Sequence, residues 1–228
     1  MNRHWRKYWW IPASILLFAF VSIYVVNLKN TQSQSLPVFH PADINPDLVD
    51  PHVDKTKAVH TIGDFHLTDQ EGNPLTPEIF KNKIYVADFF FVTCPTICPK
   101  MTKNMKILQD RFKNDDRVLF ISHTVMPEHD SVPVLKQYAI ENGIIYGKWY
   151  LVTGDKKHIY DLARKHYFAA VSKGDGGPND FIHTENFVLI DPDKRIRGFY
   201  DGTSAEEIDR LTNDIKTLLK EYEIQHLQ

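Results

Sequence analysis

The stretch that determines the fold is residues 84–100, which read IYVADFFFVTCPTICPK. Its first eight residues are apolar and aromatic except for one aspartate, and a short run of this kind predicts a buried strand over 84–91. Beyond the stretch, apolar residues recur at helical spacing, which predicts a helix over about 99–113: Met101, Met105, Leu108 and Phe112. The turn between strand and helix therefore carries whatever chemistry the stretch contains.

Cys94 and Cys98 are the only cysteines in the chain, and each precedes a proline. Because a residue before proline is disfavoured in the α region, neither cysteine should lie well inside the helix. Proline is favoured at the first helical position, which predicts a helix start near Pro99 with Cys98 at its cap. The unpaired N–H groups and the helix dipole at that point favour an anion, so a lowered thiol pKa is expected. Two activated thiols on one loop indicate a redox pair or a site for a soft metal.

The N-terminal segment predicts a membrane anchor. Residues 9–26 carry no charge, and these 18 residues are at the lower end of the length that spans a bilayer. Arg3, Arg6 and Lys7 precede them, which favours a single-pass segment of the inner (cytoplasmic) membrane with its N-terminus in the cytoplasm. A cleaved signal peptide is the alternative, but no small-x-small cleavage site follows the run and its apolar core is long. The rest of the chain is then expected to face the periplasm or the exterior.

The chain divides by composition into three parts. Residues 1–27 form the predicted cytoplasmic start and anchor, 28–57 a flexible polar linker rich in proline, and 58–228 the folded domain. The formal net charge is −2, and no basic run occurs beyond the first seven residues, so no nucleic-acid partner is expected.

The remaining patterns within 58–228 alternate between strand and helix. A small hairpin is predicted near 65–74, and the last helix has Ser204 at its cap and Glu207 as the partner of a capping box. Between them the patterns predict strands over 118–122, 149–152, 186–190 and 195–200, and helices over 132–142 and 155–166. This order predicts an α/β fold, a thioredoxin-like sandwich of a central mixed sheet flanked by helices. The cysteine turn follows the carboxyl end of a strand, where α/β sheets place their chemistry.

The Cys-x-x-x-Cys spacing allows both a disulfide and a metal site. His183 lies just before the strand predicted over 186–190, and in a thioredoxin-like sheet the segment that enters this strand lies beside the cysteine loop. Two thiolates and one imidazole suit Cu(I), a soft ion of low coordination number. Zinc, which usually takes four ligands or three and a water, remains an alternative. Simpler interpretations are a structural disulfide for the cysteines and a hydrogen-bonding role for His183.

The loop Cys94-Pro95-Thr96-Ile97-Cys98-Pro99, together with His183, resembles the copper-binding pattern of the Sco/SenC family. The similarity covers about residues 60–222 and includes three further stretches: 67–72, 149–154 and 186–193. The resemblance implies a thioredoxin-fold protein that holds copper, as Cu(I) or Cu(II), through Cys94, Cys98 and His183. It also implies delivery of that copper to the dinuclear copper site of cytochrome c oxidase, so the expected partner is the copper-accepting subunit or another copper protein.

One position departs from the family pattern. Members often have an acidic residue before the proline of the loop that follows the second core strand, whereas this chain has Met126 before Pro127. His123 and His129 are predicted to lie on the same loop. A Met/His surface that transfers copper is one interpretation, because methionine sulfur is a soft ligand. An ordinary exposed loop is the simpler one.

Two functions of different classes are compatible with these patterns. The first is a metallochaperone without enzymatic activity, which the presence of His183 favours. The second is a thiol–disulfide oxidoreductase in which Cys94 and Cys98 are the catalytic pair, one attacking and the other resolving the mixed disulfide. Such a protein would reduce the copper-ligand cysteines of a partner or act as a thioredoxin-like peroxidase.

Overall fold

The computed structural model describes residues 14–18, 20–22, 35–41, 43, 60–170, 174, 176–177 and 180–225. The strands of this part are β1 (Leu67–Asp69), β2 (Pro74–Leu75), β3 (Ile84–Phe90), β4 (Val118–Thr124), β5 (Trp149–Thr153), β6 (Asn186–Ile190) and β7 (Ile196–Asp201). The α-helices are α2 (Cys98–Phe112), α3 (Val132–Glu141), α4 (Lys156–Asp161) and α5 (Ala205–Gln225). A 3₁₀ turn, η2 (Pro77–Phe80), and a π-helical turn, η3 (Leu162–His166), complete the elements.

The seven strands of the described chain form one mixed sheet in the order β2-β1-β5-β4-β3-β6-β7. β3, β4 and β5 run parallel to one another. β6 and β7 continue the sheet in antiparallel fashion beyond β3, and the β1–β2 hairpin pairs antiparallel to β5. All seven residues of β3 are buried, as expected for the apolar run at the centre of the sheet. The predicted mixed α/β sheet is therefore confirmed, with the cysteine loop directly after β3.

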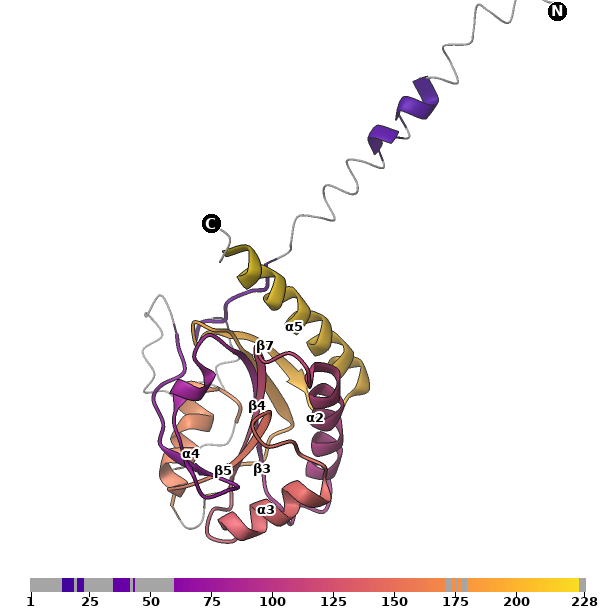
Figure 1. Ribbon diagram of the computed structural model, residues 1–228. Helices are drawn as coiled ribbons and strands as arrows, with labels where there is room; N and C mark the ends of the chain where they lie inside the picture. Colours follow the sequence, from indigo (N-terminus) through magenta and orange to yellow (C-terminus); the bar gives the residue numbers. More distant parts are fainter. Residues whose placement is uncertain are drawn as a thin grey trace, which may run out of the picture. The chain divides into compact units, whose positions relative to one another are not determined.

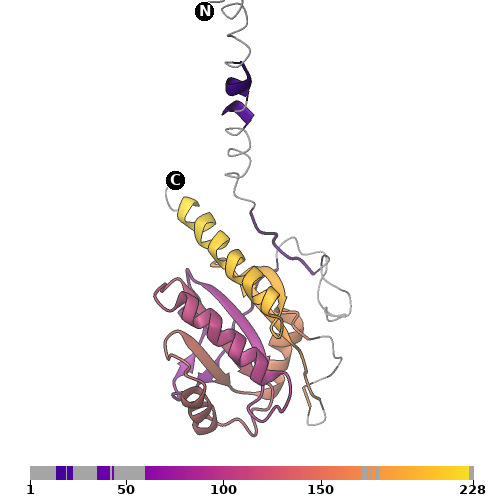
Figure 2. The same cartoon turned by 90° about the vertical axis from the view of Figure 1, so that its right-hand side faces the viewer.

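Helices cover both faces of the sheet (Figure 1). On one face α2 and α5 lie side by side (Figure 2), and the fully buried Met101, Met105 and Leu108 of α2 pack in the core that this face shares with α3. On the other face α4 and η3 close a second core. Because side chains alternate along a strand, Asp88 of β3 points to the same face as Val86 and Phe90, the face of α2.

Two elements differ from the sequence prediction. β4 extends to Thr124, two residues beyond the predicted strand, because Phe89 and Phe90 of β3 pair with the residues at its end. His123 is therefore part of the sheet and fully buried, not part of an exposed loop. The helix predicted over 155–166 is divided into α4 and the π-helical turn η3.

The predicted cap of the last helix is present in part. The side-chain oxygen of Ser204 accepts a hydrogen bond from the backbone N–H of Glu207 at 3.4 Å. The reciprocal bond of a capping box would lead from the Ser204 N–H to the Glu207 carboxylate. Instead, the Ser204 N–H donates to the Asp201 carbonyl, and the Glu207 carboxylate pairs with Arg210.

Most of the predicted anchor lies outside the described residues. Within it, residues 14–18 and 20–22 are helical. The described parts of the chain contain no helix with the length and apolar character that crossing a membrane requires. The membrane anchor at 1–27 therefore stays a prediction.

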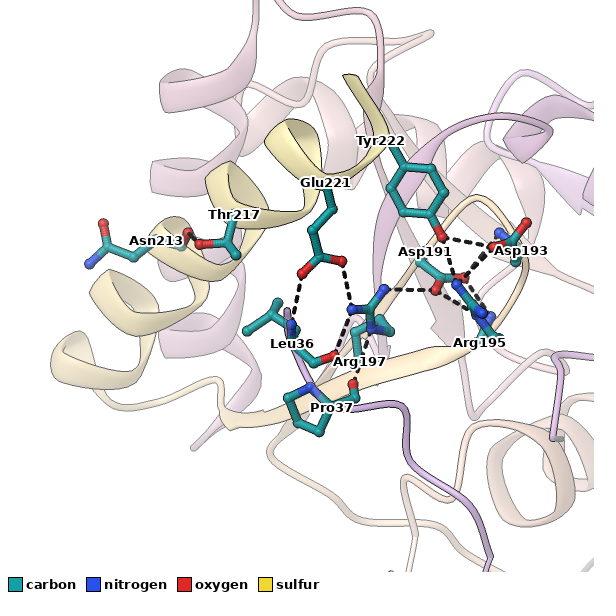
Figure 3. Close-up of polar contacts among 10 residues, drawn as sticks. All are labelled: Leu36, Pro37, Asp191, Asp193, Arg195, Arg197, Asn213, Thr217, Glu221 and Tyr222. Atoms are coloured by element: carbon teal, nitrogen blue, oxygen red, sulfur yellow. Dashed lines mark hydrogen bonds and ion pairs between the residues drawn. The ribbon is translucent and has the colours of Figure 1, made fainter. Parts of the chain in front are cut away.

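A short piece of the predicted linker contacts the domain (Figure 3). The buried guanidinium of Arg197 on β7 donates to the carbonyl oxygens of Leu36, at 2.7 Å, and Pro37, at 3.0 Å. It also pairs with Asp191 and with Glu221 of α5, whose carboxylate accepts the N–H of Leu36 at 2.7 Å. We call these five residues the Arg197 network. Leu36 thus belongs to the same compact unit as the domain, and the linker at 28–57 remains a prediction for the residues that are not described.

Candidate metal and thiol site

The cysteine loop joins β3 to α2, and the first backbone N–H of α2 points at the sulfur of Cys94. α2 begins at Cys98 with Ile97 as its N-cap, one residue earlier than predicted, and Pro99 follows within the first turn. The backbone N–H of Cys98 donates to the Sγ of Cys94 at 3.4 Å. Cys94 and Cys98 are free cysteines with no disulfide between them, and both are buried. The N–H group that a helix N-terminus leaves unpaired is therefore satisfied by Cys94.

The two thiols have opposite acidities. Burial raises the pKa of Cys94, but hydrogen bonds from the backbone of Thr96 and Cys98 outweigh it, and the net pKa is lowered to about 7. Burial, together with the neighbouring Cys94, raises the pKa of Cys98 to about 12. The expectation that Cys98 at the cap would be the acidified thiol is wrong. The helix N–H points away from its own residue and toward Cys94, so Cys94 gains the stabilisation of its anion.

A buried carboxyl group lies in the strand that leads to the loop. Asp88 is 2% exposed, and its Oδ1 has no hydrogen-bond partner among the described residues. Burial raises its pKa to about 7, against the lowering effect of a hydrogen bond with the Ser122 side chain. Its charge is also one of the contributions that raise the pKa of Cys98. Asp88 lies in the predicted strand, but nothing in the sequence distinguishes it from an aspartate that has a partner.

The loop that follows β4 supports the cysteine loop from one side. The buried Asp130 carboxylate accepts hydrogen bonds from the Thr124 hydroxyl at 2.5 Å and from the backbone N–H of Val92 at 3.1 Å. Val92 lies two residues before Cys94, so this carboxylate ties the two loops together. A role in holding the cysteine loop could not be read from the sequence at Asp130.

One of the three residues of the predicted Met/His surface is not on the surface. His123 is fully buried, its ring stacks on Phe89 at a centroid distance of 4.7 Å, and burial lowers its pKa to about 4. It therefore cannot be part of a transfer surface. Met126 is half-buried and packs against the core, whereas His129 is exposed. Only these two residues of the original set remain on the loop surface.

His183 lies on the segment that enters β6, as predicted. Its neighbours Ile182 and Thr184 are buried, and its own side chain is exposed. The ring of Phe181 contacts Phe91 edge-on at a centroid distance of 5.3 Å, and Phe91 directly follows β3. This contact places the His183 segment next to the segment that leads into the cysteine loop.

The three predicted ligands are brought together only in part. Cys94 and Cys98 are in contact through the N–H···S bond. Within the described residues, no three side chains of His, Cys, Asp or Glu form a group that could hold a metal ion. His183 as the third ligand therefore remains a prediction. Two observations support that prediction: the side chain of His183 is exposed, and its segment lies next to the segment that leads into the cysteine loop.

Most of the sequence after residue 52 matches a known protein family. The profile of the SCO1/SenC family matches residues 53–220. The SCO1 protein homolog of Bacillus subtilis is 33% identical over 155 residues, which cover 67% of this chain and 80% of the relative.

Two solved structures share the fold. BsSco, described as a member of the Sco family of cytochrome c oxidase assembly proteins with a disulfide switch, is 31% identical with a TM-score of 0.60. The match covers 73% of this chain and 98% of BsSco. ScoI of Bradyrhizobium japonicum, solved with copper bound, is 25% identical with a TM-score of 0.54, and the match covers 71% of this chain and 99% of ScoI.

Proposed function

Because the chain belongs to the SCO1/SenC family, we propose that it is a copper chaperone of cytochrome c oxidase assembly. It binds one copper ion through Cys94, Cys98 and His183 and passes it to the dinuclear copper site of the oxidase. The observation that carries the proposal is the pair of free cysteines joined by an N–H···S bond at the N-terminus of α2. Two soft donors that lie together on one loop suit a thiophilic ion such as Cu(I).

Copper is cargo in this proposal, so the site must both hold and release it. Cys94, with its pKa lowered to about 7, supplies a thiolate near neutral pH, whereas copper must displace the proton of Cys98. The imidazole of His183 is the third ligand to the copper ion in this proposal. Because it is exposed, an acceptor can displace it before the two thiolates. Release then proceeds by ligand exchange with an acceptor that offers better donors.

A thiol–disulfide oxidoreductase is the second candidate, and the difference between the two thiol pKa values favours it. The Cys94 thiolate attacks a partner disulfide, forms the mixed disulfide and releases one partner thiolate. Cys98 then loses its proton to solvent and attacks the Cys94 sulfur, which releases the second partner thiolate. Two electrons pass to the partner, and the chain ends as the Cys94–Cys98 disulfide. The disulfide switch described for BsSco supports a reversible bond of this kind.

Metal binding of the full chain, purified in detergent and reduced, tests the two candidates. We expect one tightly held Cu(I) per chain, loss of copper in Cys94→Ser and Cys98→Ser, and a large loss of affinity in His183→Ala. Zinc offered to the same protein tests metal preference, and the copper proposal requires copper to displace it. Absence of copper retention, with a readily exchanging Cys94–Cys98 disulfide, would overturn the chaperone and leave the oxidoreductase.

His129→Ala is a matched control for His183→Ala, because both imidazoles are exposed and both lie on segments that contact the chain just before Cys94. Its copper affinity should equal that of the unchanged chain. Transfer to an acceptor protein, measured for the Met126→Leu/His129→Ala double variant, separately tests the Met/His surface. Unchanged transfer would remove that surface from consideration.

We further propose that residues 9–26 anchor the protein in the cytoplasmic membrane, with the domain on the extracytoplasmic side. The uncharged run and the cations before it support this orientation. An alkaline phosphatase fused to the C-terminus, which is active only outside the cytoplasm, should be active and membrane-bound. An inactive fusion would reverse the topology, and an active fusion released in soluble form would favour a cleaved signal peptide.

A further inference from the structure

Asp180, three residues before His183, belongs to a buried ion pair. The guanidinium of Arg164, on η3, donates to both carboxylate oxygens of Asp180 at 2.6 and 2.7 Å. The two side chains are only 7% and 4% exposed. A bidentate pair of this kind fixes the direction as well as the distance between its members. The Asp180 carboxylate also accepts the backbone N–H of Gly176 at 2.7 Å.

Tyr160 extends this contact to the end of β4. The Arg164 guanidinium lies over its ring, 5.4 Å from the centroid. The Tyr160 hydroxyl donates to the carbonyl of Val125 at 2.9 Å and, more weakly, to that of Asp180 at 3.3 Å. Val125 itself donates its N–H to Phe90, the last residue of β3. Asp180 is therefore held, through its side chain and its backbone, near the ends of β4 and β3, and the cysteine loop follows β3.

A second anchor lies directly after His183. The Thr184 hydroxyl donates to the Ala169 carbonyl at 2.5 Å, and Asn186 donates to the same oxygen at 3.1 Å. Only Phe181, Ile182 and His183 lie between the two anchors, and Ile182 is 1% exposed. The backbone of His183 is thus confined to a small region, while its imidazole is free to reach outward.

From this arrangement we infer that Arg164 and Asp180 are positioning residues for the third copper ligand, His183. The inference rests on the proposed function, because it assigns the pair a role only if His183 binds the metal. Without the pair, the main restraint on His183 would be the anchor on its C-terminal side, formed by Thr184 and Asn186. The local concentration of the imidazole at the cysteine loop would then fall, and with it the affinity for copper.

The test measures Cu(I) affinity of the reduced full chain in detergent, by competition with a chromophoric chelator. We expect Arg164→Gln and Asp180→Asn to weaken binding about 10- to 100-fold, the range typical of residues that orient metal ligands. Arg164→Lys, which keeps the charge but loses the bidentate contact, should give an intermediate loss. It also serves as the milder variant if Arg164→Gln does not fold.

A double-variant comparison separates positioning from general damage to the domain. If the pair acts through His183, Asp180→Asn should cause no further loss in a His183→Ala background. The Cu(II) forms provide a second measurement: Asp180→Asn should keep the thiolate-to-copper absorption and lose the imidazole nitrogen coupling in electron paramagnetic resonance. Losses that multiply in the double variant, or retained nitrogen coupling, would overturn the inference.

Arg195→Gln is the matched control. Arg195 also pairs with a buried aspartate, Asp191, but this aspartate belongs to the Arg197 network, at the end of the sheet opposite the cysteine loop. Its copper affinity should be unchanged. If the unchanged chain itself binds no copper, the proposed function fails; if it binds copper and Arg164→Gln binds it equally well, only the positioning role fails.

Discussion

The Arg197 network differs from Asp88 and His123, near the cysteine loop, in how completely the buried polar groups are paired. At the end where β7 begins, Arg197 is 3% exposed, and its guanidinium contacts two carboxylates and two carbonyl oxygens. At the end that carries the cysteine loop, Asp88 is equally buried, yet one of its oxygens has no partner among the described residues. The same is true of Nε2 of the buried His123.

This difference separates what holds the fold from what performs its chemistry. Fully paired ions resist disruption, because removal of one partner leaves an uncompensated charge in the interior. Unpaired buried groups cost stability and typically occur where a protein uses their altered acidity. The Arg197 network is therefore expected to contribute mainly to stability, whereas Asp88 and His123 near the cysteine loop are groups whose altered acidity the protein can use.

The largest expected effect concerns the Arg197 network. Arg197→Met should lower the free energy of unfolding by about 3–5 kcal/mol, because it leaves Asp191 and Glu221 buried without their shared cation. Urea unfolding of the full chain in detergent, followed by circular dichroism, measures the loss. Copper affinity should be retained wherever the variant is folded. A loss below about 1 kcal/mol would contradict the assignment of stability to this network.

At the cysteine end, Asp88→Asn should increase stability in alkaline solution. The pKa of Asp88 is raised from 3.8 to about 7 by burial, so between these values the folded chain binds more protons than the unfolded chain. Stability is therefore lost as pH rises from about 4 to 7, by about 2–4 kcal/mol in total. Asparagine avoids this loss, so the variant should exceed the unchanged chain at pH 8 and match it near pH 4.

His123 acts in the opposite direction over part of the same range. Its pKa is lowered to about 4 by burial, so its contribution to stability is lost as pH falls from about 6.5 toward 4. The Asp88→Asn variant and the unchanged protein both contain His123, so its contribution cancels when their stabilities are subtracted. Equal unfolding midpoints at pH 8 would show that Asp88 gains a partner in solution.

The thiols should differ in reactivity by at least about a hundredfold at pH 8, because Cys94 has a pKa of about 7 and Cys98 one of about 12. Limited alkylation with iodoacetamide, located by mass spectrometry, should modify Cys94 first. Its rate should rise with pH and reach half its maximum near pH 7. Preferential modification of Cys98 would reverse the proposed order of attack and resolution in the oxidoreductase mechanism.

The smallest effect is expected on the exposed face of α2. Lys106→Gln removes an ion pair with Asp110, and both side chains are partly exposed to solvent. Such pairs contribute at most about 0.5 kcal/mol, and salt screens them. Thermal unfolding should therefore change little. A change comparable with that of Arg197→Met would remove the distinction between buried and exposed pairs.

Much of the fold could be predicted because its signals are local. The apolar run that became β3, the helical spacing after Pro99 and the turn between β6 and β7 each span a few residues. The position of His183 beside the cysteine loop followed from the predicted sheet order. The strand, helix and turn predictions needed no information about contacts between distant parts of the chain, whereas the prediction for His183 needed the arrangement of a thioredoxin-like sheet.

The features that were missed depend on distance in sequence or on exact direction. Arg164 meets Asp180 sixteen residues away, and Arg197 meets Leu36 across 161 residues. Nothing in the sequence links these partners. The acidity of each thiol depends on which sulfur accepts the first N–H of the helix. Because α2 begins one residue earlier than predicted, at Cys98, this N–H faces Cys94. His123 was misplaced because strand ends are set by pairing with neighbours.

The contacts of Leu36 also determine how mechanical force enters the domain. The paired registers place the start of β7 at the same end of the sheet as the start of β3, with β6 between them, whereas the cysteine loop follows the last residue of β3. Seven strand residues at about 3.3 Å each separate the two points by roughly 20 Å. A pull exerted through the preceding chain is therefore borne by β7 and α5. The cysteine loop lies at the opposite end of the sheet from the point at which such a pull would act.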